Sequence, residues 1–226
     1  NSIMNKIIQS IFKNKKANDE KLLKYGFNKV GDAFVYQTDI FQQFLLKIKI
    51  TSGEVETLVI ENDTQEPYTL FLTNEAQGSF VGAVRQQYQD ILTDIANKCF
   101  DKNVFKTQMA KKVIDYVSQN YDDELEFLWE KFDDNAIWRR KDNKKWYGAI
   151  LTVKKCKLGL STDEKVEVLD LRAKPEKLQM LIDNIHIFSG YHMNKKHWIS
   201  VLLDECTNEK EVFDLIDQSY IIAGQK

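Results

Sequence analysis

Several residue types are scarce in this sequence, and each shortage excludes a class of protein. The 226 residues include 9 glycines and 2 prolines, too few for a collagen-like or low-complexity chain. The 3 cysteines are far apart and form no CxxC pair, so neither a disulfide framework nor a zinc ribbon is indicated. The longest uninterrupted apolar run is four residues, as at Tyr220–Ala223, whereas a membrane-spanning helix needs about 20. A hydrophobic fraction of 43% and an aromatic fraction of 12% instead describe a chain that folds.

Charge of one sign is not in excess either. The 32 basic and 34 acidic residues give a formal net charge of −2, which excludes a strongly basic protein that coats nucleic acid. Charge is uneven along the chain, because residues 115–134 contain eight acidic residues and one lysine, and residues 138–157 contain eight basic residues and one aspartate. The first residues lack the apolar core of a signal peptide, so we expect a cytoplasmic protein with no membrane partner.

The first half of the chain has the pattern of a small α+β unit. Alternation of apolar residues and lysines over 44–50 is typical of a half-buried strand. An apolar stripe at helical spacing runs over residues 80–99, with Ser79 as the expected N-cap. The remaining segments predict helices over 3–12 and 19–25 and strands over 33–38, 55–60 and 68–72. Together they indicate a first domain over residues 1–103.

The second half, residues 104–226, again mixes helices with antiparallel strands. Two apolar runs flank the polar stretch 141–145, which predicts a β-hairpin with a charged tip. Pro175 suits the first turn of a helix over 176–183, and Asn208 suits the N-cap of the last helix. The other predicted elements are strands over 136–140, 146–153, 166–171 and 197–203 and a helix over 106–120. We therefore expect an α+β domain, an antiparallel sheet backed by helices, preceded by the smaller α+β unit.

The sequence assembles no catalytic or metal site. His186, His192 and His197 lie within twelve residues, but a spacing of five between the last two suits neither a helix face nor a strand face. His197 shares its side of the predicted strand with Ile199 and Val201, so we expect it to face the core. A nucleophile elbow and an H-E-x-x-H motif are absent from the sequence. We predict no catalytic residue, no metal and no cofactor, and hence a protein that is not an enzyme.

Basic residues interleaved with aromatics gather at the predicted hairpin and again just before Trp198, a pattern typical of phosphate contact. The candidate nucleic-acid-binding residues are Arg139, Arg140, Lys141, Lys144, Lys145, Trp146, Lys154, Lys195 and Lys196. A second interpretation stays open. Lysines at hairpin tips also favour solubility and block edge pairing, and the acidic residues over 115–134 could simply neutralise them.

Four blocks of the second half resemble the MmcQ/YjbR family in order and spacing. They are Trp138–Arg140 with Asn143–Gly148, then Val166–Arg172, Gly190–Val201 and Ser219–Tyr220. The stretch Tyr191–Trp198, which reads YHMNKKHW, is the most specific of them. The resemblance covers about residues 106–223, and the first half looks like the leading domain of longer bacterial members.

The resemblance implies a CyaY-like α+β fold and DNA binding through a double wing. It implies that the wings carry basic residues already named, which are Arg139, Arg140, Lys144, Lys145, Lys195 and Lys196. It also implies signature residues that fix the second loop, which are Tyr191, His192, Asn194, His197 and Trp198. The family usually has Asn and Lys where this chain has Asp170 and Arg172.

Two functions of different class therefore remain open. The first is a non-enzymatic DNA-binding protein that contacts phosphates. The chain has only four arginines, whose rigid fork suits bidentate reading of guanine, so we expect weak sequence specificity. The second is a module that binds an unidentified protein or a small molecule on the sheet surface or at the junction between the halves. Basic residues gathered on one face would favour DNA, and basic residues that scatter or are covered by the acidic run would favour the module.

Overall fold

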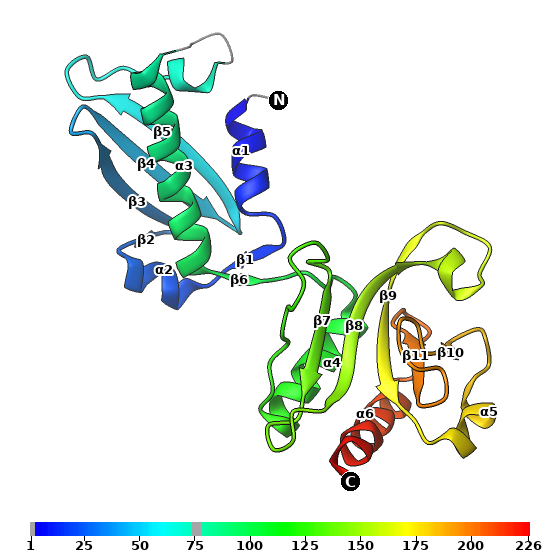
Figure 1. The fold of residues 1–226 in the computed structure, drawn as a ribbon. Coiled ribbons are helices and arrows are strands. Elements are labelled where there is room, and N and C mark those ends of the chain that lie inside the picture. The colour runs from blue at the N-terminus through cyan, green and yellow to red at the C-terminus, as the bar shows by residue number, and fades with distance from the viewer. Residues whose placement is uncertain (1–2, 74–77) are drawn as a thin grey trace. The chain divides into compact units, whose positions relative to one another are not determined.

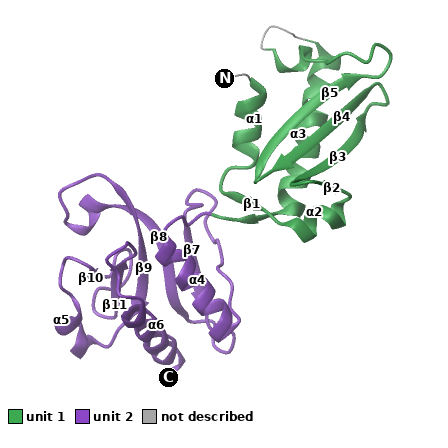
Figure 2. Cartoon of the chain, turned by 180° about the vertical axis from the view of Figure 1, so that it is seen from behind, with its two compact units in different colours: residues 1–103 green, residues 104–226 purple. Residues whose placement is uncertain are grey.

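A computed structural model gives the fold of the chain and describes residues 3–73 and 78–226 (Figure 1). The chain forms two compact units, residues 1–103 and residues 104–226 (Figure 2). Each unit combines helices with an antiparallel sheet, so the expected α+β class is confirmed. No helix in the described ranges is both long and apolar enough to cross a membrane.

Unit 1 is built on a four-stranded antiparallel sheet in the order β2-β3-β4-β5. Its strands are β2 (Asn28–Val30), β3 (Ala33–Ile40), β4 (Phe44–Thr51) and β5 (Glu54–Glu61). In β4, Leu46 and Ile48 are buried whereas Lys47 and Lys49 are exposed, as the alternating pattern predicted. The long helix α3 (Ser79–Cys99) lies across the buried face of this sheet (Figure 1).

Smaller elements close unit 1. The two predicted helices are observed as α1 (Ile3–Ile11) and α2 (Asp19–Tyr25). A two-stranded ribbon of β1 (Lys15–Ala17) and β6 (Phe100–Lys102) joins the start of the unit to its end. No residue of α1 is fully buried, so this helix rests on the core through half-buried side chains such as Met4 and Ile8.

Two local predictions for unit 1 are wrong. The strand expected over 68–72 is instead a 3-10 turn, η1 (Leu70–Leu72). Pro67 makes one isolated bridge to Ile60 and Tyr68 donates to the carbonyl of Val59 at 2.8 Å, but the chain then turns and Phe71 is buried in the core. The N-cap of α3 is Gly78 rather than Ser79, and the helix begins there without a side-chain cap.

Unit 2 contains a five-stranded antiparallel sheet in the order β10-β11-β9-β8-β7. Its strands are β7 (Asn135–Arg139), β8 (Trp146–Lys154), β9 (Lys165–Arg172), β10 (Ile187–Ser189) and β11 (Trp198–Leu202). Helices α4 (Gln108–Tyr121) and α6 (Glu209–Gly224) bury their apolar faces in the main core, on one side of the sheet. A smaller apolar cluster on the other side includes Ile137, Leu151 and Phe188.

Polar caps fix the ends of these helices. The Glu167 side chain accepts hydrogen bonds from the backbone N–H groups of Lys106 and Thr107, both at 2.8 Å, just before α4. Asn208 accepts from the backbone of Glu211 at 3.1 Å, which confirms it as the N-cap of α6. The hairpin of β7 and β8 is confirmed as well, with a register shift between Trp138 and Arg139.

One helix prediction in unit 2 is wrong. The helix expected over 176–183 is only a 3-10 turn, η3 (Pro175–Lys177), followed by the single turn α5 (Leu178–Leu181). The Asp183 carboxylate accepts from the backbone N–H groups of the three residues Ile185, His186 and Ile187, which stops the helix and starts β10. These hydrogen bonds lower the pKa of Asp183 to about 2.

Candidate nucleic-acid interface

The register of the sheet brings two loops to the same end of unit 2. Trp146 pairs with Arg139 where β8 begins, and Trp198 pairs with Arg172 where β11 begins. Gly190 closes the second loop by donating its N–H to the carbonyl of Trp198 at 3.0 Å. The hairpin loop (residues 140–145) and the second loop (residues 190–197) therefore leave the sheet at one end. Since β9 alone lies between β8 and β11, the two strands are separated by about 10 Å.

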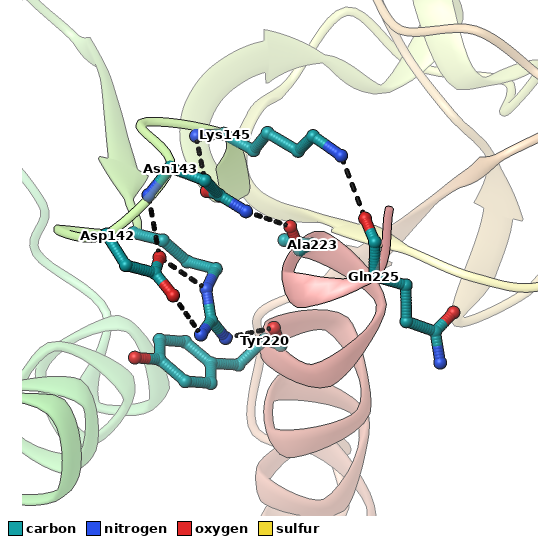
Figure 3. Close-up of polar contacts among 7 residues, drawn as sticks. Asp142, Asn143, Lys145, Tyr220, Ala223 and Gln225 are labelled. Atoms are coloured by element: carbon teal, nitrogen blue, oxygen red, sulfur yellow. Dashed lines mark hydrogen bonds and ion pairs between the residues drawn. The ribbon is translucent and has the colours of Figure 1, made fainter.

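The hairpin loop is docked on the C-terminal end of α6 (Figure 3). Three side chains of the loop donate to backbone carbonyls there: Arg140 to Tyr220 at 2.7 Å, Asn143 to Ala223 at 2.7 Å, and Lys145 to Gln225 at 2.9 Å. The last carbonyls of a helix lack intrahelical partners, and positive charge near them is favourable. The hairpin loop thus caps α6, and its cations Arg140 and Lys145 are engaged in this cap.

Arg140 is the most heavily engaged of the expected phosphate contacts. Its guanidinium also forms a two-point ion pair with Asp142, at 2.9 and 2.7 Å, and lies 4.0 Å from the centroid of the Tyr220 ring. The side chain is only 15% exposed. The hydrogen bonds from Arg140 lower the pKa of Asp142 to about 2. In this structure Arg140 joins the hairpin to the last helix.

The acidic run neutralises two more cations of the hairpin. Arg139 pairs with Glu126 at 2.7 Å. The ammonium of Lys141 lies 2.6 Å from the carbonyl of Asp122 and 3.6 Å from the carboxylate of Asp123. Asp123 is itself buried and accepts a hydrogen bond from the hydroxyl of Tyr147 at 2.6 Å.

Three expected cations remain open to solvent at this end of the sheet. Lys144 extends from the hairpin loop, and Lys195 and Lys196 extend from the second loop. Within the part of the chain that the structure describes, no carboxylate lies within 4.0 Å of these three ammonium groups. Lys154 is not one of this group, because it stands at the other end of β8, eight residues and about 27 Å from Trp146.

Asn194 and Trp198 shape the second loop. The Asn194 side chain accepts from the backbone of Lys196 at 2.9 Å, and its carbonyl accepts from the backbone of His197 at 3.0 Å. Trp198 is buried against the backbone of Gly190, where an added Cβ would lie 2.8 Å from the Cβ of Trp198. These contacts hold Lys195 and Lys196 in a tight, outward-facing turn.

The two histidines of the second loop, His192 and His197, are both exposed to solvent. His197 is exposed, so the prediction that it faces the core is wrong. The reason is that β11 begins only at Trp198, which leaves His197 in the preceding turn, outside the strand alternation. His192 is also exposed, with φ of 58°, and its ring lies against that of Tyr191, with centroids 4.0 Å apart and planes tilted by 51°. Among the described residues, no group of His, Cys, Asp and Glu side chains could hold a metal ion.

Asp170 lies beneath the second loop. It is completely buried in β9, where Ser200 donates to one carboxyl oxygen and the other oxygen, Oδ2, has no partner. The hydroxyl of Ser200 in turn accepts from the backbone of Tyr191 at 2.8 Å, which links the acid to the start of the loop. Burial raises the pKa of Asp170 to about 8, so the group is protonated at neutral pH.

Two residues of this end were missed as candidate site residues. Trp129 is 36% exposed and meets Trp146 edge-on, with ring centroids 5.9 Å apart. Arg172 donates to the carbonyl of Trp146 and lies 4.7 Å from the ring of Trp198, between the two loops. The position of Trp129, in an acidic and irregular segment, gave no periodic signal that could have placed it beside the hairpin.

These features define a small α+β domain in which two lysine-bearing loops project from one end of an antiparallel sheet. The sequence model of the YjbR family matches residues 120–222, and the chain belongs to this family. It is 38% identical over 108 residues to the uncharacterized protein YyaQ of Bacillus subtilis (strain 168), a match that covers 48% of this chain and 92% of YyaQ. The resemblance read from the four sequence blocks is thereby confirmed.

Two further similarities were found. The chain is 44% identical over 57 residues to the uncharacterized protein YbdF of Escherichia coli O157:H7, covering 24% of this chain and 46% of YbdF. A crystal structure of a Pseudomonas syringae protein is 39% identical, with a TM-score of 0.49, and the match covers 50% of this chain and 97% of that one.

Proposed function

We propose that unit 2 is a non-enzymatic DNA-binding domain that contacts the phosphate backbone through Lys144, Lys195 and Lys196. The observation that carries the proposal is that these three ammonium groups stand on two loops at one end of the sheet without carboxylate partners in the described chain. Exposed lysines spaced across a surface are suited to neutralising successive phosphates. The double wing implied by the family resemblance has the same two loops.

The arginines support weak sequence specificity. Arg85 donates to the carbonyls of Phe71 and Thr73, and Arg139, Arg140 and Arg172 each donate to an acceptor of unit 2. All four arginines of the chain therefore already donate within the protein, and few guanidinium donors remain for bidentate reading of guanine. Residues 106–226 contain 20 bases and 21 acids, a net charge of −1, so attraction to DNA is local and moderate.

The proposal is tested by fluorescence anisotropy of the full chain with a labelled 20-bp duplex at low salt. We expect binding, and we expect the triple variant Lys144→Gln, Lys195→Gln, Lys196→Gln to lose most of it. A matched control changes Lys157, Lys165 and Lys210 to Gln, which removes the same charge from exposed positions outside the two loops. No binding by the unaltered protein at 20 mM salt would rule the function out.

A small-molecule-binding module is a second candidate, supported by a groove in unit 1. The groove has a volume of about 870 Å³, within the range of small-ligand sites. Its floor is the middle of the sheet, and α1 forms one wall. Lining residues include Met4, Ile8, Tyr36, Ile48, Val55 and Thr57. Anilinonaphthalene sulfonate should bind there with enhanced fluorescence that Ile8→Glu abolishes. If that variant binds the dye unchanged, the groove is not the site.

A further inference from the structure

We infer that the nucleic acid bound by unit 2 is single-stranded or locally unpaired, with its bases stacked on an aromatic row between the two loops. The row consists of Trp146, Arg172, Tyr191 and His192. This inference rests on the proposed function and names the form of its ligand. It follows from the aromatic side chains of the row, because a surface that only neutralises phosphates needs cations and no aromatic rings.

Trp146 begins the row on the side of the hairpin loop. It directly follows Lys145, is only partly buried, and packs against the smaller apolar cluster. The edge-on contact with Trp129, at an interplanar angle of 83°, holds the ring in place. A partly exposed tryptophan near an unpaired lysine, here Lys144, is the combination that single-strand-binding surfaces use, because every base has a face that can stack.

Arg172 occupies the centre of the row. Its Nε donates to the carbonyl of Trp146 and its guanidinium carbon lies 4.7 Å from the centroid of the Trp198 ring, so the group is held at a fixed place against the protein. It remains partly exposed. A fixed guanidinium plane can stack on a base as well as attract a phosphate.

Tyr191 and His192 end the row in the second loop, next to Lys195 and Lys196. Their rings are in contact, with centroids 4.0 Å apart and planes tilted by 51°, and the backbone of Tyr191 donates to the hydroxyl of Ser200. Lysines thus flank the row on both sides, which complements a strand whose phosphates run along its edges while its bases lie between them. Bases in a duplex are already stacked on one another and present no face to such a row.

The acidic run limits where the strand can lie. Glu126 is paired with Arg139, but Glu130 and Asp133 are exposed on the segment that carries Trp129. Their charges repel phosphates, which directs the strand to the side of Trp146 that faces the second loop. Trp129 therefore acts as a positioning residue for Trp146 and does not itself stack on the ligand.

The test compares three labelled 20-mers by anisotropy: oligo(dT), an abasic strand of the same length, and the 20-bp duplex. Stacking on even one side chain should make oligo(dT) bind about 5- to 150-fold more tightly than the abasic strand. Trp146→Leu should reduce this difference by about 5-fold or more and leave duplex binding unchanged. Trp146→Phe should retain it and lose the quenching of tryptophan emission by oligo(dT). Phe132→Leu, an exposed aromatic outside the row, is the matched control.

The outcomes separate this inference from the proposed function. If the duplex binds but oligo(dT) and the abasic strand bind equally, the aromatic row is not a stacking surface and the proposed function stands. A duplex that binds more tightly than oligo(dT) also overturns the inference. If neither the duplex nor either single strand binds, both the inference and the proposed function are overturned.

Discussion

The guanidinium of Arg140 lies 4.0 Å from the ring centroid of Tyr220, and its Nη1 donates to the carbonyl of the same residue. The two residues are 80 positions apart and belong to different blocks of the family pattern, Trp138–Arg140 and Ser219–Tyr220. Ser219, next to Tyr220, donates to the carbonyl of Tyr147 and accepts from the backbone of Arg172. The separate sequence blocks thus meet at one junction between the hairpin, β9 and α6.

Arg140→Ala should destabilise unit 2. The change removes the helix cap, the stacking on Tyr220 and the pair with Asp142, and we expect a loss of about 2–3 kcal/mol in the free energy of unfolding. Urea unfolding followed by tryptophan fluorescence measures it. Arg140→Lys should restore only part of the loss, because an ammonium cannot form the two-point pair. A loss below about 0.5 kcal/mol would mean that the junction does not depend on Arg140.

Asp170→Asn should stabilise the protein at alkaline pH. Because the folded pKa of Asp170, about 8, lies above the ordinary value near 4, the folded state keeps a proton that the unfolded state has lost. This contribution to the free energy of unfolding therefore falls as the pH rises from about 4 to 8 and is constant above that range. The variant should remove the fall, with a gain of about 2–4 kcal/mol at pH 8.

The measurement is urea unfolding at pH 5, 6, 7 and 8, with Asp214→Asn, an exposed change on α6, as the control. Asn is also the residue that the family resemblance implies at this position, and it offers Ser200 a neutral acceptor like the protonated acid. Parallel pH profiles for the unaltered protein and Asp170→Asn would show that Asp170 does not retain its proton.

Gly190→Ala should destabilise unit 2 by about 2 kcal/mol. The added Cβ would lie 2.8 Å from the Cβ of Trp198 and 3.0 Å from its carbonyl oxygen, so the backbone of the second loop would have to move. Gly82→Ala is the contrasting variant. Gly82 lies inside α3 with nothing within 4 Å of an added Cβ, and alanine there should raise the stability of unit 1 by about 0.5–1 kcal/mol. Equal thermal shifts in the same direction for both variants would contradict this account of Gly190.

Local patterns predicted most of the elements, because their causes are local. The alternation around Lys47 and Lys49 marks a strand with one buried face. Asn208 caps α6 by accepting from the backbone of Glu211, three residues further along the chain. The predictions failed where the contacts of a few residues decide the outcome. Asp183 stops a helix with its side chain, and the chain leaves the ladder after Tyr68 so that Phe71 is buried in the core.

The candidate site was predicted less completely than the fold. Composition showed that the hairpin is basic but could not show that Arg140 and Lys145 are used to cap a helix some 80 residues later in the chain. Arg140 and Lys145 meet their partners only through the tertiary fold, and such contacts produce no periodic pattern in the sequence. Lys154 is different, since counting along the predicted strand already places it far from the hairpin tip.

The salt dependence of duplex binding tests the central claim most directly. If Lys144, Lys195 and Lys196 each neutralise one phosphate, the logarithm of the binding constant should fall with the logarithm of salt concentration with a slope of about −2.7. The triple Gln variant of these residues should bind too weakly to give a slope or give one close to zero, and the Lys157, Lys165, Lys210 control should keep a slope of about −2.7. Equal slopes for the triple variant and the unaltered protein would contradict the assignment of DNA binding to these two loops.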